Sequence, residues 1–240
     1  GSNMQIYKLT LAPKSTWRTP LQSDTIFGHY CWAIAREYGD AELGSFLDSC
    51  SAGSPPVVFS SAFPAGFLPF PILPPLHTYQ KNELERTYSF EVLKPALKTK
   101  WISKDYLLEN AGAFSLIKAI RHILDNPGYG PPDIHSRTRM HNSINRMSGT
   151  SLQKGGLYSE EEFINVTNDG DKPAPLKFDL YAAISSENDP EIFTELISNV
   201  FSDGYGKDAS TGHGHFEITG ISKEYFPEPD DNITVMSLSD

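Results

Sequence analysis

The chain has 240 residues, of which 39% are hydrophobic and 21% charged, and its formal net charge at pH 7 is −10. These values are typical of a globular protein with one large domain or two small ones. No apolar run is long enough to cross a bilayer, so the sequence predicts no membrane partner. The negative net charge, taken alone, argues against a nucleic-acid-binding protein.

Cysteine usage and the first residues indicate the setting of the chain. Cys31 and Cys50 are too few for a disulfide framework, which predicts a cytoplasmic location. Residues 1–3, Gly-Ser-Asn ahead of Met4, have the character of an expression-tag remnant and are left out of the fold prediction.

Charge is unevenly distributed along the chain. Three segments contain no Asp or Glu but do carry Lys or Arg, namely residues 4–23, 92–104 and 134–159. Carboxylates are concentrated elsewhere, and 13 of the 30 lie in residues 160–162, 169–171, 187–195 and 224–231. This segregation predicts one locally positive face on an otherwise acidic protein, whose remaining surface can face protein partners.

Hydrophobic periodicity predicts the first elements. Residues 4–11 alternate between apolar and polar positions and predict a strand. Residues 26–35 place apolar side chains at helical spacing, which predicts a helix capped by Asp24 and ended by Gly39. A short strand over residues 57–61 follows.

Residues 64–134 predict a large insertion in the fold. Its first part, residues 64–75, is proline-rich and apolar, and no regular helix or strand tolerates that proline density. This strap is either packed on the core or a surface for a partner, and the sequence leaves both open. A lysine-rich segment around Trp101 and a short helix over residues 113–124 follow.

Residues 135–147 and 155–166 predict two strands joined by a turn, together forming a hairpin rich in polar side chains. Arginine can make bidentate contacts with phosphate, and amides can contact base edges. The hairpin residues predicted to do so are Arg137, Arg139, Asn142, Asn145, Arg146, Ser148 and Lys154.

The last part of the chain predicts a strand over 176–184, a helix beginning at Pro190 and a strand over 215–221. The whole order is β-α-β, an insertion with a hairpin, then β-α-β. This order predicts an α+β, ferredoxin-like (RRM-like) domain over residues 4–222, with two helices on one face of an antiparallel sheet. Residues 223–240 predict a linker and the first strand of a second domain.

A glycine-rich loop over residues 203–215 separates that last helix from the last strand. Its four glycines permit positive φ and close approach of another backbone. Its polar side chains suit a chain of phosphates and sugars better than one compact ligand; they belong to Tyr205, Lys207, Ser210, Thr211, His213 and His215.

Catalytic motifs are sparse in this sequence. It contains no HExxH, paired CxxC, P-loop or GxSxG motif, and the run Glu160-Glu161-Glu162 is interpreted as a solvated turn rather than a metal site. His29 is the one candidate acid or base, because a helix N-terminus would keep its ring neutral for attack of an RNA 2′-hydroxyl on phosphate. A histidine that only contacts RNA is the simpler interpretation.

Three segments resemble the RAMP superfamily of CRISPR-associated RNA-binding proteins, and a fourth does so more weakly. Within it they resemble the family of fourth subunits of the type III-A Csm effector complexes. The segments are residues 19–28 running into 31–33, residues 143–149 with 156–158, residues 204–216 and, more weakly, residues 98–103.

The resemblance implies a RAMP fold and a non-catalytic subunit that needs no cofactor or metal. Its implied partners are the 5′ tag of the crRNA, the large polymerase-like signalling subunit, the backbone RAMP subunit and target RNA near the first guide pairs. Added to the residues of the hairpin and of the glycine-rich loop, the RNA-contacting residues it implies are Arg18, Ser23 and His29.

Two other functions remain open at the level of sequence. One is a metal-independent RAMP endoribonuclease that processes CRISPR repeat RNA with His29 as acid or base. The other is a protein-interaction module that uses the proline-rich strap and the acidic C-terminal stretch.

Overall fold

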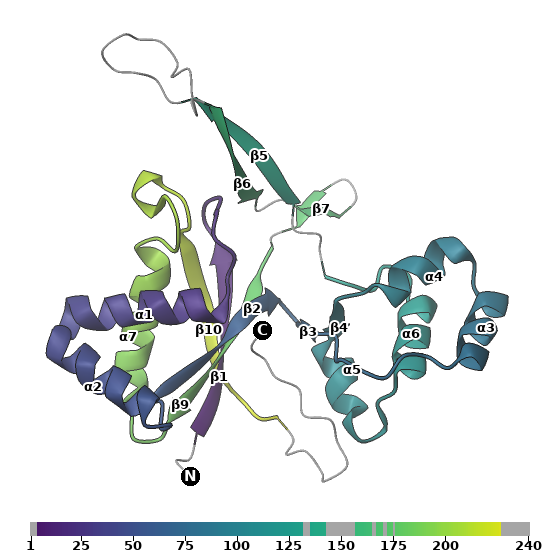
Figure 1. Ribbon diagram of the computed structural model, residues 1–240, viewed down its shortest axis with the longest axis horizontal. Coiled ribbons are helices and arrows are strands. Elements are labelled where there is room, and N and C mark those ends of the chain that lie inside the picture. Colours follow the sequence, from purple (N-terminus) through teal and green to yellow (C-terminus); the bar gives the residue numbers. More distant parts are fainter. Residues whose placement is uncertain are drawn as a thin grey trace.

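The computed structural model describes residues 4–131, 135–142, 157–164, 167–169, 172–174 and 176–226. Four antiparallel strands form the central sheet in the order β10–β1–β9–β2 (Figure 1). Their bounds are Met4–Pro13 for β1, Val57–Pro64 for β2, Phe178–Ser185 for β9 and Phe216–Glu224 for β10. Counted as the four strands of a βαββαβ unit, this order is the ferredoxin-like one, which confirms the predicted α+β class.

Two helices, α1 (Ser23–Tyr38) and α7 (Pro190–Ser202), cover one face of the sheet (Figure 1). Their apolar stripes pack on side chains of the central strands, such as Leu9 and Leu180, which lie opposite each other in the register of β1 and β9. Each such large apolar side chain stabilises the fold by about 1.5–3 kcal/mol when fully buried. The buried helix residues of this core are Ile26, Tyr30, Ala33, Ile34, Phe193, Leu196, Ile197, Val200 and Phe201.

The predicted start of α7 at Pro190 and the predicted end of α1 at Gly39 are confirmed, and the predicted cap of α1 is wrong. Asp189 caps α7 by accepting a hydrogen bond from the Glu191 backbone N–H at 2.8 Å, and Gly39 ends α1 with a φ of +88°. Asp24, however, lies within the first turn of α1, because the helix is capped at Gln22 and so begins two residues earlier than predicted. A second helix, α2 (Asp40–Ser51), follows α1 directly and runs antiparallel beside it.

The insertion (residues 65–131) forms a second packed unit on the opposite side of the sheet from α1 and α7 (Figure 1). Its small sheet pairs β3 (Phe67–Pro69) with β4 (Trp101–Ser103). Its helices are α3 (Thr78–Thr87), α4 (Phe90–Leu97), α5 (Lys104–Glu109), the 3₁₀ turn η1 (Ala111–Ala113) and α6 (Leu116–Asp125). A local core of Leu84, Leu93, Ala96 and Ile120 holds α3, α4 and α6 together.

The insertion covers part of the second face of the sheet, over β2 and β9. Phe63 of β2 and Tyr181 of β9 pack with Leu68, Ile102 and Ala119 of the insertion, and all five side chains are buried. Strand β9 is therefore buried on both faces, although its alternating sequence is that of a strand with one solvated face.

The proline-rich strap divides between its two predicted roles. Leu68 is fully buried, and the ring of Phe70 packs against Phe114 with centroids 6.3 Å apart. Ile72, four residues beyond Leu68, has 96% of its surface exposed. The first half of the strap is therefore part of the core, and the second half is a free apolar surface.

The hairpin projects away from the rest of the domain (Figure 1). It pairs β5 (His135–Asn142) with β6 (Leu157–Ile164), and a shorter pair, β7 (Thr167–Asp169) and β8 (Lys172–Ala174), follows it. The run Glu160–Glu162 is part of β6, so its interpretation as a solvated turn was wrong. The predicted turn at Ser148-Gly149 and the second-domain strand within 227–240 lie outside the described residues.

Candidate functional site

The glycine-rich loop joins α7 to β10, as predicted, and all four of its glycines have positive φ. At three of them, Gly204, Gly206 and Gly214, a side chain would collide with the protein, and a Cβ on Gly204 would lie 2.5 Å from Ala209 Cβ. A Cβ on Gly206 would lie 2.3 Å from Thr19 Oγ1, and one on Gly214 would lie 2.0 Å from the Tyr205 carbonyl oxygen. The expected close approach of another backbone is therefore confirmed at Gly214, where the approaching backbone is the protein's own, whereas Gly206 lies against the Thr19 side chain.

The loop is held against the segment that follows β1. The Gly214 N–H donates to the Thr16 carbonyl at 2.9 Å, and the Lys207 N–H donates to Thr19 Oγ1 at 2.9 Å. The Tyr205 N–H closes the loop on itself by donating to the Gly214 carbonyl at 2.7 Å. The loop therefore has a defined conformation set by main-chain hydrogen bonds.

Tyr205 is an anchor of this loop and lies in the core. Its side chain is fully buried, and its hydroxyl donates to the Pro20 carbonyl at 2.7 Å. Burial raises the pKa of this hydroxyl well above its usual range, so Tyr205 stays neutral. The prediction that Tyr205 contacts RNA is corrected by this burial, because no face of its ring reaches the surface.

His29 also supports the loop. The Gly206 N–H donates to His29 Nε2 at 3.0 Å, which places the ring proton on Nδ1. Partial burial lowers the pKa of His29. The predicted direction of the pKa shift is therefore confirmed, but its cause is desolvation rather than the helix N-terminus. A general base needs the nitrogen lone pair that this hydrogen bond already occupies, which weakens the endoribonuclease alternative.

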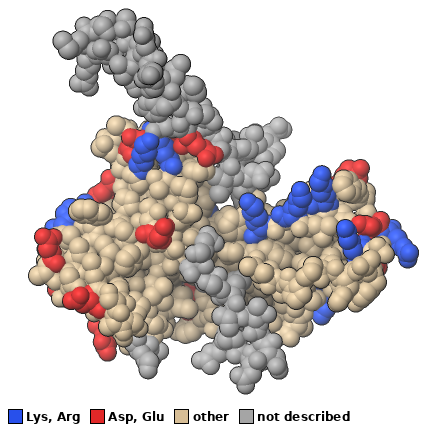
Figure 2. Space-filling model, viewed as in Figure 1, with Lys and Arg blue, Asp and Glu red and all other residues tan. Residues whose placement is uncertain are grey.

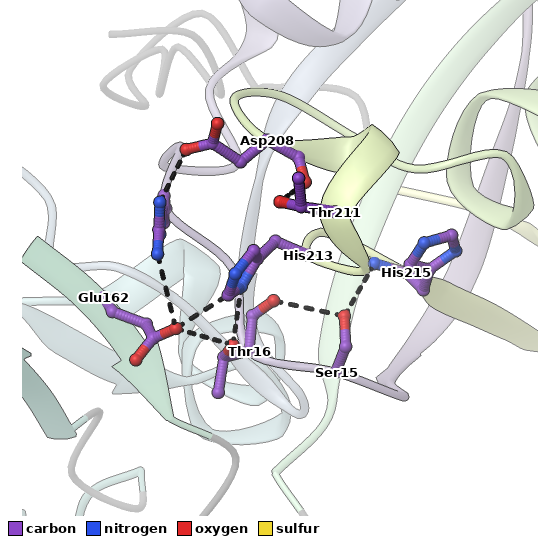
Figure 3. Close-up of polar contacts among 8 residues, drawn as sticks. Ser15, Thr16, Glu162, Asp208, Thr211, His213 and His215 are labelled. Atoms are coloured by element: carbon purple, nitrogen blue, oxygen red, sulfur yellow. Dashed lines mark hydrogen bonds and ion pairs between the residues drawn. The ribbon is translucent and has the colours of Figure 1, made fainter. Parts of the chain in front are cut away.

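A buried carboxylate joins the base of the hairpin to the glycine-rich loop (Figure 3). Glu162 of β6 is completely buried, and Thr16 Oγ1 donates to Glu162 Oε1 at 3.0 Å. His213 Nδ1 lies 2.8 Å from Thr16 Oγ1 and 3.3 Å from the same carboxylate oxygen. Three segments distant in sequence therefore meet at one carboxylate.

Arg18 extends this polar cluster to a second carboxylate. Its side chain is only 7% exposed, its Nη1 lies 2.6 Å from Asp208 Oδ2, and its Nη2 lies 4.0 Å from Glu162 Oε1. The prediction that Arg18 contacts RNA directly is corrected by this geometry, because the guanidinium is enclosed between protein carboxylates. Its role is to hold the glycine-rich loop and the hairpin base together.

The hairpin base is also fixed by main-chain contacts beside this cluster. The Trp17 N–H donates to the Phe163 carbonyl at 3.2 Å, and the Phe163 N–H donates back to the Trp17 carbonyl at 2.7 Å. The two rings stack with centroids 5.7 Å apart. Strand β6 is thus attached to the segment that carries Thr16 and Arg18.

The remaining loop residues differ in their exposure. Lys207, Ser210 and Thr211 are exposed and form the outer rim of the loop, as their predicted role requires. His215 is turned back, with Nδ1 2.9 Å from the Ser202 carbonyl at the end of α7. Ser23 lies half-buried at the start of α1, where its N–H donates to Ser61 Oγ at 3.1 Å.

The predicted hairpin residues are only partly within the described chain. Arg137, Arg139 and Asn142 lie on β5, for which the structure describes the backbone, and the register places Arg137 opposite Glu162 and Arg139 opposite Glu160. The other four predicted contacts are outside the described residues: Asn145, Arg146, Ser148 and Lys154.

Charge at the site is mixed rather than uniformly positive. Lysine or arginine and carboxylates lie side by side at the foot of the hairpin (Figure 2). A separate group of basic side chains lies on the insertion (Figure 2). Lys94 of α4 and Lys98 and Lys100, which follow α4, are among the exposed residues of the insertion. Glu162 and Asp208 were not predicted as site residues, because only the fold brings them to Arg18.

No protein-family model matches the chain, and no curated protein matches it. Solved structures do. A chain of the Csm1–Csm4 cassette in complex with cA4 aligns with a TM-score of 0.55 at 16% identity, covering 94% of this chain and 72% of that one. A chain of the Csm3–Csm4 subcomplex of the type III-A CRISPR-Cas interference complex aligns with a TM-score of 0.50 at 14% identity, covering 92% and 70%.

A third structure extends the likeness to another subtype. A chain of the type III-B Cmr-beta complex bound to cognate target RNA aligns with a TM-score of 0.50 at 8% identity, covering 92% of this chain and 60% of that one. Csm4 is the subunit that the Csm1–Csm4 and Csm3–Csm4 assemblies have in common. The chain therefore has the RAMP fold of type III CRISPR effector subunits and is Csm4-like in its architecture.

Proposed function

We propose that this protein is a non-catalytic, RNA-binding subunit of a type III CRISPR effector complex that holds the 5′ tag of the crRNA. The observation that supports this most is the attachment of the hairpin base to the glycine-rich loop through Glu162 and Arg18. This attachment sets the glycine-rich loop, whose exposed residues include Lys207, beside β6, and the partner strand of β6 in the hairpin carries Arg137 and Arg139. Cations and hydroxyl groups of these kinds are the ones that bind the phosphates of a nucleic-acid strand.

The proposed protein partners follow from the fold. The solved assemblies with this fold pair Csm4 with Csm1 and with Csm3. By analogy, the chain bridges a large signalling subunit and a backbone RAMP subunit, and its projecting hairpin lies near the first pairs between guide and target RNA. This step is an inference from likeness of fold.

The salt dependence of RNA binding tests the proposed surface. Affinity of the full chain for single-stranded RNA carrying a repeat-derived 5′ tag is measured over a range of salt concentrations. Lys207→Ala and Arg139→Ala are each expected to reduce the slope of log K against log salt by about 0.7, the share of one phosphate contact on a single strand. Lys81→Ala, an exposed lysine on α3, is the matched control and leaves the slope unchanged. Unchanged slopes in both test variants would rule out this surface.

The endoribonuclease alternative has a direct test. The purified chain is incubated with CRISPR repeat RNA in EDTA, beside a His29→Ala variant. No cleavage is expected from either protein, because His29 Nε2 is engaged by the Gly206 N–H. Cleavage that depends on His29 would replace our proposal with the nuclease. Absence of any crosslink to RNA in the assembled complex would instead favour a protein-interaction module.

A further inference from the structure

An aromatic pocket of about 460 Å³ lies where the insertion meets the central sheet. Its volume is in the range of sites that take small molecules, about 300–1,000 Å³. Its walls come from the segment after β1, from β2, from the hairpin base and from the insertion. The residues that the argument uses are Trp17, Phe63, Phe163, Lys100 and Trp101.

Two groups of rings line this pocket. Trp17 stacks on Phe163 with centroids 5.7 Å apart, and Trp101 packs beside Phe63 with centroids 6.1 Å apart. Trp17 is 2% exposed, whereas Trp101 is only half-buried and so keeps ring surface open to the pocket. Trp101 is therefore the ring on which an incoming flat group can stack.

The polar groups at the pocket favour an anionic ligand. Lys100, next to Trp101, is exposed and lines the pocket, and Gln22 adds an exposed amide. No carboxylate is among the described residues that line it. Two further lysines precede Lys100 in the chain: Lys94 near the end of α4 and Lys98 at its C-cap, and both are exposed.

This combination fits one kind of occupant best. Single-stranded nucleic acid is bound by aromatic rings that stack its bases beside cations that follow its phosphates. An apolar protein segment would use the rings but would gain nothing from the row of lysines. The pocket also adjoins the candidate site, because Trp17 and Phe163 flank Arg18 and Glu162 in the chain.

We propose that the aromatic pocket takes one unpaired base of the bound RNA, stacked on Trp101, with the adjoining phosphates on Lys100 and Lys98. This inference rests on the proposed RNA-binding function. It adds a subsite between the insertion, the central sheet and the hairpin base, beyond the exposed rim of the glycine-rich loop.

The test separates base stacking from charge. Affinity of the full chain is measured for two labelled single strands of equal charge, an octamer of riboadenosine and an octamer of abasic ribose phosphate. The wild-type chain is expected to prefer the first strand roughly tenfold to a hundredfold, since stacking on one aromatic ring contributes about that much. Trp101→Leu, which keeps an apolar side chain but no aromatic face, is expected to lose most of this preference while keeping its affinity for the abasic strand.

Trp32 supplies the matched control. It is 77% exposed on α1 and does not line the pocket, so Trp32→Leu is expected to keep the preference. Trp101→Phe, which retains a ring, is expected to keep part of it. Lys100→Ala is expected to weaken binding of both strands equally.

The outcomes distinguish a failure of the base-stacking proposal from a failure of the proposed RNA-binding function. If Trp101→Leu binds both strands as the wild type does, the base stacks elsewhere or a protein segment fills the pocket, and this inference is overturned while RNA binding stands. If the wild-type chain binds neither strand, the proposed function and this inference fail together.

Discussion

Gly214 lies directly against the main chain of Tyr205. The Tyr205 N–H donates to the Gly214 carbonyl at 2.7 Å, and a Cβ on Gly214 would lie 2.0 Å from the Tyr205 carbonyl oxygen. Gly212, two residues earlier, has a similar positive φ of +91° but open space where a Cβ would be. The two glycines therefore separate the effect of backbone conformation from the effect of contact.

Alanine at these two positions is expected to have unequal effects. Gly212→Ala has only the strain of a left-handed residue and should lower the free energy of unfolding by about 1 kcal/mol. Gly214→Ala adds a collision with backbone that cannot move without breaking hydrogen bonds, and should cost clearly more, about 3 kcal/mol or above. Urea denaturation of both variants measures the difference. Equal losses would contradict the close packing of the loop.

Removal of the charge on Glu162 should loosen the hairpin base. Glu162→Gln keeps the shape of the side chain but loses the charged acceptor of Thr16 Oγ1 and the partner of Arg18 and His213. Hydrogen bonds to a charged group are worth about 1.5–3 kcal/mol, and we expect a loss of that size in the free energy of unfolding. Glu161→Gln, on the same strand but exposed, is the control and should change stability by less than about 0.5 kcal/mol.

Arg18 should behave as a structural cation and not as a contact with RNA. Arg18→Ala leaves Glu162 buried without its cation and should cost roughly 3 kcal/mol or more of stability. Because the guanidinium is enclosed, the salt dependence of RNA binding by the folded fraction should stay that of the wild type. A reduced salt slope with normal stability would show the opposite, that Arg18 neutralises a phosphate.

The pKa of His29 predicts a pH-dependent stability. Burial holds this pKa below 6.5, its ordinary value, so the unfolded chain binds a proton more readily than the folded one. The contribution of the neutral His29 ring to the free energy of unfolding is therefore complete above pH 6.5. It is lost as the pH falls from there through the pKa of the folded state. His29→Gln keeps an acceptor near the Gly206 N–H but does not titrate. The free energy of unfolding should fall less steeply between pH 7 and pH 5 in His29→Gln than in the wild type, and parallel curves would contradict this assignment.

Tyr181 offers a substitution that should increase stability. Its side chain is 3% exposed, and within the described part of the chain its hydroxyl oxygen has no hydrogen-bond partner. Tyr181→Phe removes a buried, unsatisfied group and keeps the ring that packs on Phe63 and Phe226. An unsatisfied polar group costs about 1–3 kcal/mol, so thermal unfolding should move upward by a few degrees. A lower melting temperature would indicate that the hydroxyl is satisfied in solution.

The sheet and its two helices could be predicted from sequence because their signals are local. Alternation in β1, helical spacing in α7 and the Asp189-Pro190 start of that helix each depend on a few adjacent residues. Helices α3 and α4 were not predicted, because they lack such a local signal. Each has one or two buried positions, Leu84 in α3 and Leu93 and Ala96 in α4, and α4 contains Pro95, so neither shows a clear apolar stripe.

The candidate site was predictable in its position but not in its chemistry. The glycines marked the loop correctly, because positive φ is a property that sequence shows directly. The roles of Arg18 and Tyr205 depend on which side chains surround them, and Glu162 and Asp208 are far from Arg18 in the chain. Arg18 lies in an acid-free segment, so the sequence alone predicted that it binds RNA. In the fold, two carboxylates distant in sequence pair with it instead.

The double-sided burial of β9 has a consequence for shortening this protein. Phe63 and Tyr181 face the insertion, so a version without residues 65–131 would place these two rings in water on the bare face of the sheet. Excision with a simple linker should therefore produce an aggregating chain rather than a minimal RNA-binding module. A shortened version would first need polar residues in place of Phe63 and Tyr181. The insertion is therefore a third structural layer of the domain, on which the sheet depends.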